Sequence, residues 1–573
     1  MDYFQAIAFL VLLLLAWGFA AQIQQPNLVF ILADDFGWND VSFHGSKQIP
    51  TPNLDALAFS GLILQNYYVT PLCTPSRSAL MTGKHPIHTG MQHDVLYGYS
   101  RYGLPLSETT LPDHLKLLGY KNHIVGKWHL GHYKSVYTPL HRGFDSHYGY
   151  WTGHQDYYDH TAVEWNAWGY DMRRNNSVDW SAYGKYTTTI LTDEARDVIT
   201  KHDISSPLFL YIAHLAVHSA NPYSPLQAPE ETVKMFSNIE DLQRRRYAAM
   251  VHELDVSVGK IVKALGDKNM LKNTVIVFSS DNGGPAAGFN QNAASNWPLK
   301  GVKNTPWEGG VRAAGVVWSP LIPEDRRGRV MSNLMDISDW LPTLFEAAGE
   351  SQLTPASSLS NCLCTISNLG GDVASLKGLD GVSHWSTILY DKPSARHHVL
   401  HNIDDKMGYA AIRKKNWKLV KGTTYDGSWD GWYGPSGRMN DSCIHSFNSI
   451  DDAGPIEKKK LLKSDAGRYI SRLGISVIDN LNQLLKDAEI KCGERPVDAH
   501  ACLPLDAPCL FDIDQDPCEY NNLAEKLPDI ANDLLDLLNW YNATAVAPLN
   551  TQPDPMSNPK YWNYTFTNWA DFE

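Results

Sequence analysis

The sequence predicts an α/β protein. Its large domain has a mixed, mainly parallel sheet flanked by helices, and a smaller C-terminal α+β domain with an antiparallel sheet follows. Continuous apolar runs in residues 27–35, 206–218 and 273–284 each end in polar residues, as strands buried on both faces do. Between the last two runs, apolar residues recur at the spacing of one helix face. Strands that alternate with helices indicate a parallel sheet.

The C-terminal part of the chain has a different pattern. Residues 397–404 and 409–420 alternate between apolar and polar positions, as strands of a half-buried antiparallel sheet do. Residues 455–487 have a helical pattern, and we interpret their lysines as a solvated helix face. We therefore divide the chain into a large domain over 22–390 and a smaller domain over 391–573.

The chain is large and acidic. Its 573 residues exceed the usual size of a single core, and its formal net charge of −13 argues against nucleic acid as a partner. An acidic protein still accepts an anionic substrate where its site is locally basic.

The first segment is an apolar run that ends in small residues, and we interpret residues 1–21 as a signal peptide. Because no positive charge precedes the run, an uncleaved anchor is the alternative. We expect no other membrane span and a place in the secretory pathway, lysosomal or extracellular. Four glycosylation sequons support this location: Asn175, Asn440, Asn542 and Asn563.

The cysteines fall into two groups. Seven lie between Cys362 and Cys518 and suit disulfides in an oxidising compartment, whereas Cys73 stands alone. We expect a local loop closed by Cys509 and Cys518. Since seven cysteines cannot all pair with one another, either one stays free or Cys73 is the eighth partner.

Cys73 opens the stretch "CTPSRSALMTG", which indicates a turn that leads into a helix. A helix N-terminus attracts negative charge. Cys73 is therefore either placed for chemistry on an anion or is a small buried hydrophobe. Arg77 follows one helical turn later and reaches the same pocket.

Polar residues follow two of the predicted strands. Asp34 and Asp35 come after the first run, and Asp281 and Asn282 come after the third. Ligands of open α/β sheets lie beyond the carboxyl ends of the strands, so these side chains are expected to converge. Three carboxylates and one amide oxygen suit Ca²⁺ or Mg²⁺ rather than zinc. The alternative is that each acid only caps a turn or a helix.

Several cations accompany these oxygen ligands. Lys127 and His129 are two residues apart, so an extended segment would turn both side chains to one face. Together with Arg77, His218 and Lys303 they suit a tetrahedral oxyanion, and phosphate and sulfate fit equally well at this point.

The stretch "CTPSRSALMTGKHPIHTG" resembles the signature of the sulfatases of the alkaline-phosphatase superfamily, Cys-x-Pro-x-Arg with a Leu/Met-Thr-Gly continuation. "LVFILADDFGWNDVSFHG", "VGKWHLGHY" and "NWPLKGVKNTPWEGGVR" extend the likeness toward the arylsulfatase B (N-acetylgalactosamine 4-sulfatase) subgroup. The resemblance implies that Ca²⁺ is bound by Asp34, Asp35, Cys73, Asp281 and Asn282. It also implies that the sulfate is held and its chemistry assisted by Arg77, Lys127, His129, His218 and Lys303.

Two neighbouring residues do not fit the family pattern. Lys303 is preferred to Lys300 because it stands four residues before Trp307, as in the family. His214 lies close to His218 in the sequence and does not match the motif.

The resemblance further implies a mechanism and a substrate. A formylglycine-generating enzyme would convert Cys73 to Cα-formylglycine, one hydroxyl of its hydrate would attack sulfur, and the other would expel sulfate. The implied substrate is the N-acetylgalactosamine 4-sulfate unit of glycosaminoglycans. The alternatives are an arylsulfatase for small aryl or plant-derived sulfates, and a non-catalytic secreted binding protein on the same scaffold. A phosphatase of the superfamily is disfavoured because those enzymes usually place Ser or Thr where Cys73 stands.

Overall fold

The structure is a computed structural model. It describes residues 25–164, 167–349, 373–438, 458–498 and 500–573. Some of the predicted features lie outside the described residues: the signal peptide, the sequon at Asn440, and Cys362, Cys364 and Cys443.

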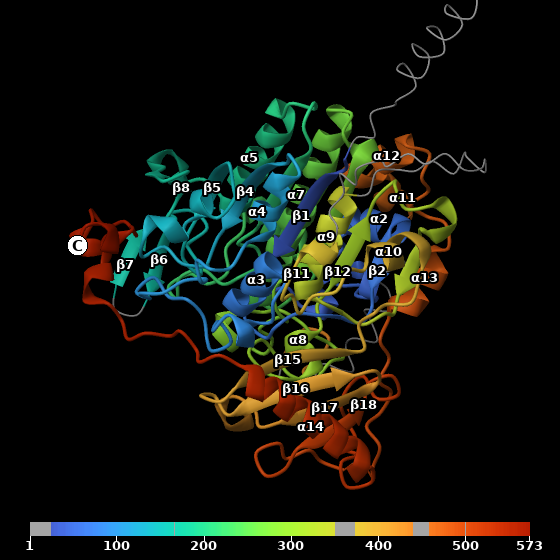
Figure 1. Cartoon of the computed structure of the whole chain (residues 1–573). Helices are drawn as coiled ribbons and strands as arrows, with labels where there is room; N and C mark the ends of the chain where they lie inside the picture. Colours follow the sequence, from blue (N-terminus) through green and yellow to red (C-terminus); the bar gives the residue numbers. More distant parts are fainter. Residues whose placement is uncertain (1–24, 165–166, 350–372, 439–457, 499) are drawn as a thin grey trace, which may run out of the picture.

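The large sheet has ten strands in the order β13-β2-β12-β11-β1-β10-β4-β5-β8-β9 (Figure 1). Its parallel centre consists of β11 (Thr274–Ser280), β1 (Asn27–Ala33), β10 (Leu208–Ala213), β4 (Lys121–Lys127) and β5 (Ser146–Tyr150). Of these strands, β1, β10 and β11 are the three predicted apolar runs. The outer strands run in both directions: β13 (Arg329–Met331), β2 (Leu62–Leu64), β12 (Gly315–Trp318), β8 (Arg173–Arg174) and β9 (Ser177–Val178). The predicted mixed, mainly parallel sheet is confirmed.

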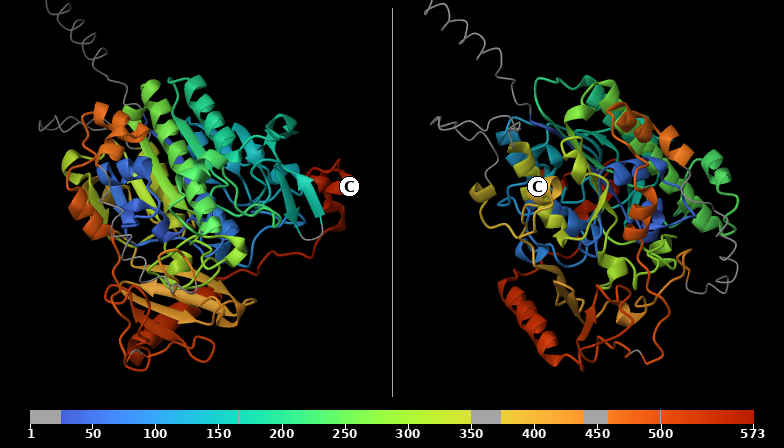
Figure 2. Two further views of the ribbon diagram at one scale, coloured as in Figure 1. Left: turned by 180° about the vertical axis from the view of Figure 1, so that it is seen from behind. Right: turned by 90° about the vertical axis from the view of Figure 1, so that its right-hand side faces the viewer.

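Helices cover both faces of this sheet (Figures 1 and 2). Alternate residues of β1 point into two different cores, because successive side chains of a strand face opposite sides. One face is covered by α2 (Pro52–Ser60), α5 (Thr187–Lys201), α6 (Glu230–Met235) and α7 (Leu242–Asp267). The other is covered by α3 (Cys73–Thr82), α4 (Leu111–Leu117), α9 (Trp340–Gly349) and α10 (Trp385–Tyr390). The helix predicted between the second and third apolar runs is α7.

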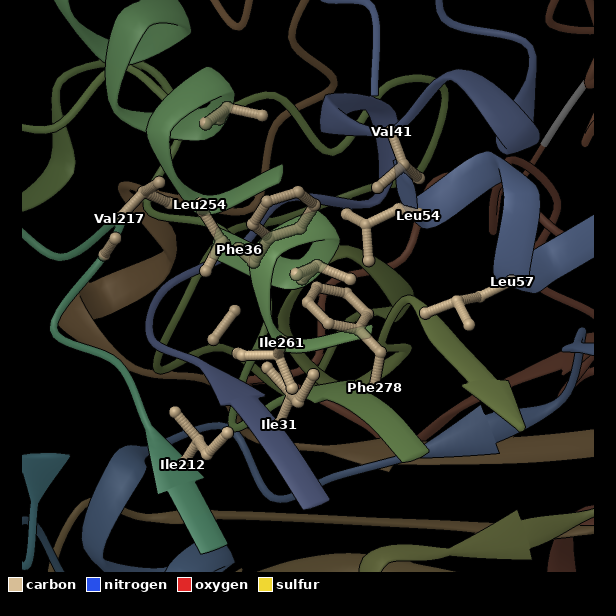
Figure 3. Close-up of a cluster of buried hydrophobic side chains, with 14 of the residues drawn as sticks. Ile31, Phe36, Val41, Leu54, Leu57, Ile212, Val217, Leu254, Ile261 and Phe278 are labelled. Atoms are coloured by element: carbon tan, nitrogen blue, oxygen red, sulfur yellow. The ribbon is translucent and has the colours of Figure 1, made fainter. Parts of the chain in front are cut away.

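A cluster of buried hydrophobic side chains packs beside the ends of β1 and β11, which the residues of the predicted site follow (Figure 3). Ile31 of β1 and Phe278 of β11 pack against Leu254 and Ile261 of α7 in one core, and all four are fully buried. Phe36 follows β1 and meets Phe278 edge-on, with the ring centroids 5.7 Å apart. The residues after β1 and β11 are therefore held in place by the closely packed side chains of these two strands and α7.

The smaller sheet is antiparallel, as predicted. It has four strands, β15 (His398–Asp404), β16 (Tyr409–Lys414), β17 (Trp417–Lys421) and β18 (Cys509–Asp512). Helix α14 (Pro528–Thr544) packs on it through Leu534 and Leu538. In Figure 1 this sheet lies beside α8 (Glu308–Val311) of the large body.

Two segments beyond residue 390 return to the large body. The predicted helical region forms α11 (Lys458–Lys463), α12 (Asp465–Arg472) and α13 (Leu481–Ala488), whose buried residues belong to the core around α2 and α7. The tail after α14 reaches β7 (Ala167–Tyr170), which pairs with β6 (Thr161–Glu164), and the Tyr170 N–H donates to the Tyr564 carbonyl at 2.8 Å. Residues 391–573 thus form the small sheet and also pack on the core of the large sheet. The domain boundary at residue 390 stays a prediction.

The disulfide expectation is wrong. Cys509 pairs with Cys502 and Cys518 pairs with Cys492, while Cys73 is free and buried. Strand β18 starts at Cys509 and carries the chain away from it, so Cys518 meets another segment. Within the described part of the chain, Cys73 therefore has no disulfide partner.

Within the described residues, no helix combines the length and the apolar character needed to cross a membrane. Three of the sequon asparagines are exposed, namely Asn175, Asn542 and Asn563, and their glycosylation remains a prediction.

Replacing Phe278 by Ala tests whether this core supports the strand ends. We expect Phe278→Ala to lower the free energy of unfolding by about 3–5 kcal/mol, because it leaves a cavity beneath them. Leu117→Ala is the control, since Leu117 is 84% exposed, and its effect is expected to stay within about 0.5 kcal/mol. Urea unfolding followed by tryptophan fluorescence measures both. Equal stability of Phe278→Ala and the wild type would contradict this assignment of the core.

Candidate active site

Four polar residues that follow strands meet at the carboxyl edge of the large sheet. Asp34 and Asp35 come after β1, and Asp281 and Asn282 come after β11; all four are fully buried. The Asp35 N–H donates to Oδ1 of Asp281 at 3.3 Å, and Asn282 Nδ2 donates to Oδ1 of Asp35 at 2.7 Å. The neighbouring parallel strands β1 and β11 thus bring the two pairs together.

Each of the three carboxylates lies against a buried cation, and Arg77 is also 3.5 Å from Asp34. The pairs are Asp34 with Lys127 at 2.6 Å, Asp35 with Lys303 at 2.6 Å, and Asp281 with Arg77 at 2.7 Å. These six residues are called the charge cluster below. Burial opposes ionisation of Asp34 and Asp35, but the neighbouring cations outweigh it and hold the pKa of both carboxyls below the usual value. The cluster therefore holds three negative and three positive charges.

Cys73 lies against the charge cluster. It is the first residue of α3, as the sequence predicts, and the turn before the helix is held by the Thr70 N–H, which donates to Ser76 Oγ at 3.0 Å. Cys73 Sγ lies 3.5 Å from Oδ1 of Asp34 and 3.4 Å from Nζ of Lys303. Burial raises the pKa of the Cys73 thiol, and nearby Asp281 adds to the rise. As an unmodified cysteine, Cys73 is thus held as a protonated thiol, which is a poor nucleophile.

His129 reaches this site by a different geometry from the predicted one. Lys127 ends β4, but His129 has a left-handed backbone with φ of 60°, so the segment is not extended. His129 Nε2 lies 2.7 Å from the Leu96 carbonyl and must donate to it, which leaves Nδ1 as an acceptor. That Nδ1 atom is buried and has no hydrogen-bond partner among the described residues. Burial, with Lys127 and Arg77 nearby, lowers the pKa of His129 and keeps the ring neutral.

His218 lies near Oδ2 of Asp35, whereas Lys303 pairs with Oδ1. Its Nε2 is 3.5 Å from Oδ2 of Asp35, and its Nδ1 donates to the Ser219 carbonyl at 2.6 Å. Burial lowers the pKa of His218. His154 stacks on His218, with the ring centroids 6.0 Å apart, and sequence reasoning missed it. A single histidine between β5 and β6 has no spacing signal that would have identified it.

The two residues that sequence reasoning set aside lie elsewhere. Lys300 Nζ packs over the Trp307 ring, 3.4 Å from its centroid. His214 Nε2 lies 3.2 Å from Oγ of Ser257 on α7. The choices of Lys303 and His218 are consistent with these contacts.

The site offers several candidate ligands for a metal ion. Candidate ligand atoms of Asp34, Asp35, Cys73 and His218 all lie within 4.8 Å of one another. Two further observations point the same way: Asp35 Oδ2 and Asn282 Oδ1 are buried oxygens without a hydrogen-bond partner in the described part of the chain. Unpaired oxygens in a dry interior are costly, and a divalent cation would satisfy them.

A second buried network ties the Lys303 loop to the small sheet. Lys418 of β17 lies 2.9 Å from Oε1 of Glu308, at the start of α8, and 2.8 Å from Oε1 of Glu519. All three side chains are fully buried, and the Glu308 N–H also donates to Glu519 at 2.9 Å. Lys418 holds the pKa of Glu308 below its usual range against the effect of burial. Lys418 of the small sheet therefore anchors Glu308, which follows the Lys303 loop and also pairs with Arg312 at 3.3 Å.

Comparison with known proteins specifies the class of protein to which this fold and this charge cluster belong. A model of the sulfatase family matches residues 26–350. Arylsulfatase J of Mus musculus is 38% identical over 550 residues, covering 94% of this chain and 79% of the relative. N-acetylgalactosamine-6-sulfatase of Homo sapiens is 36% identical over 364 residues, covering 59% of this chain and 65% of the relative. A crystal structure of Ps i-CgsB superposes with a TM-score of 0.65 at 25% identity, over 92% of this chain and 94% of that one.

The chain belongs to the sulfatase family. It is accordingly a sulfuric ester hydrolase, as the sequence resemblance implied. The names of these relatives do not include N-acetylgalactosamine 4-sulfatase, so the position of the sulfate on the substrate stays a prediction.

Replacing Lys418 by Met tests the network behind the Lys303 loop. Lys418→Met leaves Glu519 without its cation and Glu308 with Arg312 as its remaining ion-pair partner, so we expect a loss of about 3–5 kcal/mol in the free energy of unfolding. Lys414→Met is the matched control, since the Lys414–Asp533 pair is 37% and 57% exposed and such pairs contribute about 0–1 kcal/mol. Urea unfolding compares the two variants, and equal losses would contradict the role given to Lys418.

Proposed function

We propose that the chain hydrolyses sulfate esters through a Cα-formylglycine formed from Cys73, with Ca²⁺ held by Asp34, Asp35, Asp281 and Asn282. The observation that carries this proposal is the position of Cys73. It starts a helix inside a charge cluster, in contact with Asp34 and Lys303, yet as a buried thiol it lacks nucleophilic character. Sγ of Cys73 stands in for the oxygen atoms of the modified side chain.

The oxygen ligands fit Ca²⁺ in number and kind. Carboxylate and amide oxygens are the donors that Ca²⁺ prefers, and flexible geometry suits a mixed set of this type. Asp35 Oδ2 and Asn282 Oδ1 supply two buried oxygens that accept no hydrogen bond from the described residues. When bound, the metal and the hydrated formylglycine supply a polarised sulfuryl group and the attacking hydroxyl.

The cations of the site would hold the sulfate. Arg77, Lys127 and Lys303 are buried and positively charged, so their donors can bind sulfuryl oxygens and stabilise the negative charge that develops on them. His129 has an unused acceptor in Nδ1, which can take a proton from a hydroxyl of the modified Cys73. Lys303 and His218 both contact Asp35. We assign to these two residues the protonation of the leaving oxygen.

The proposed substrate is a sulfated sugar, and N-acetylgalactosamine 4-sulfate in glycosaminoglycans is the first to test. A relative named for N-acetylgalactosamine 6-sulfate, and a neighbouring crystal structure that contains a neocarrahexaose, support a glycan. Small aryl or plant-derived sulfates are the second candidate, which the name arylsulfatase J favours. A non-catalytic binding protein on this scaffold is disfavoured because every predicted site residue is present. The sequons and the disulfides support a lysosomal or extracellular location.

Mass spectrometry of the peptide that spans Cys73 tests the proposed nucleophile. In protein secreted from a eukaryotic cell with an active formylglycine-generating enzyme, we expect the mass of formylglycine at position 73. Cys73→Ala should lower the hydrolysis of N-acetylgalactosamine 4-sulfate and of 4-nitrophenyl sulfate by at least about a thousandfold. An unmodified thiol in fully active protein would contradict the mechanism.

Removal of the metal tests the proposed Ca²⁺ site without relying on activity. We expect Ca²⁺ at about a hundred times its Kd to stabilise chelator-treated protein by about 2.7 kcal/mol, because the ion binds only the folded state. Asp35→Asn keeps the volume but removes a ligand charge, so it should abolish the rise in Tm. Asp405→Asn, at an exposed position, is the control and should preserve it. A Ca²⁺-induced rise that survives in Asp35→Asn would place the ion elsewhere.

A further inference from the structure

A tyrosine from the small sheet lies next to the Lys303 loop. Tyr425 follows β17, and its hydroxyl accepts a hydrogen bond from Asn304 Nδ2 at 2.8 Å. The preceding Thr424 Oγ1 donates to the Asn304 carbonyl at 2.6 Å. Since Asn304 follows Lys303, whose Nζ lies 3.4 Å from Cys73 Sγ, the Tyr425 ring is tied to the site through one residue.

Tyr425 is also close to the charges at this side of the site. Burial raises its pKa, the hydrogen bond from Asn304 opposes that rise, and the charges of Asp94 and Lys303 act on the same hydroxyl. Tyr425 nevertheless remains 48% exposed, whereas Asn304 and Lys303 are each 3% exposed. The ring thus extends from the buried Asn304 toward solvent.

The backbone here is held in an uncommon conformation. Asn304 has φ of 63°, and Tyr425 and Asp426 both have φ of 52°, which is the left-handed region that residues other than glycine rarely occupy. Such residues cluster at functional sites, where the surrounding structure holds them in place. Tyr425 is held in this conformation by its surroundings, which include the hydrogen bond from Asn304.

Other aromatic residues support the ring from one side. Phe289 packs edge-on against Tyr425, with the ring centroids 5.5 Å apart, and Trp429 packs on Phe289 at 5.0 Å. Asn304 Oδ1 is buried and has no hydrogen-bond partner among the residues that the structure describes. A fixed, half-exposed ring beside an unused acceptor suits a sugar, which has apolar C–H faces and hydroxyl donors.

We propose that Tyr425 and Asn304 hold the sugar ring that carries the sulfate ester: the ring packs on Tyr425, and one hydroxyl donates to Asn304 Oδ1. This inference rests on the proposed function, because it places the sugar beside the sulfate that Lys303 binds. Tyr425 is thereby a specificity-determining residue, contributed by the small sheet to a site built on the large one.

Binding to the Cys73→Ala protein tests this inference, because it needs neither formylglycine nor turnover. The ligands are N-acetylgalactosamine 4-sulfate and inorganic sulfate, measured by calorimetry on Ca²⁺-loaded protein. Adding Tyr425→Ala should weaken binding of the sulfated sugar about tenfold and leave the affinity for inorganic sulfate unchanged. Adding Tyr425→Phe, which keeps the ring, should change the affinity for the sugar by less than about threefold. Tyr183→Ala is the control, since Tyr183 is 66% exposed and lies outside the site, and it should change neither affinity.

Three outcomes overturn the inference. Equal affinity of the Cys73→Ala proteins with and without Tyr425→Ala for the sulfated sugar would exclude a sugar contact at Tyr425 and leave the proposed function intact. A matching loss for inorganic sulfate would mean that Tyr425 only supports the Lys303 loop. Failure of the Cys73→Ala protein to bind either ligand would overturn the sulfate site itself, and this inference with it.

Discussion

The balance of buried charge at the carboxyl edge of the large sheet is the constraint on which the site depends. Three carboxylates and three cations lie together without solvent, each carboxylate paired with one cation at 2.6–2.7 Å. Because an unpaired buried charge costs several kcal/mol, no member of the cluster can be lost alone. A divalent cation bound at Asp35 Oδ2 and Asn282 Oδ1 adds two positive charges to this balanced cluster, and an anion held by the cations offsets them. The binding of Ca²⁺ and of a sulfate ester is therefore coupled in the site that we propose.

The fold meets this constraint by bringing distant segments to one edge. Parallel pairing of β1 with β11 sets two polar pairs side by side, and a helix that starts at Cys73 faces them. Left-handed backbone at Asp35 and at His129 turns these residues at the ends of their strands. Lys418 of the small sheet pairs with Glu308, which follows the Lys303 loop. The small sheet thus also stabilises buried charge next to the site.

Much of this arrangement could be predicted from the sequence, because it follows from local patterns. The apolar runs identified β1, β10 and β11, and the rule that ligands lie beyond the carboxyl ends of strands located Asp35 and Asp281. Features fixed by contacts between distant segments could not be predicted: the pairing of Cys509, the packing of α12 on the large core, and the approach of Tyr425 to Asn304. No sequence period or spacing signals contacts of that kind.

A crystal structure of the secreted protein grown with Ca²⁺ and sulfate tests whether the metal and the sulfate bind together at the charge cluster. We expect a metal ion bound to Asp35 Oδ2 and Asn282 Oδ1, with Lys127 and Lys303 moved from their carboxylates to the oxygens of a bound sulfate. Anomalous scattering would identify the ion. A structure that keeps both lysine–carboxylate pairs, with sulfate bound and no metal at these oxygens, would contradict coupled binding of Ca²⁺ and sulfate.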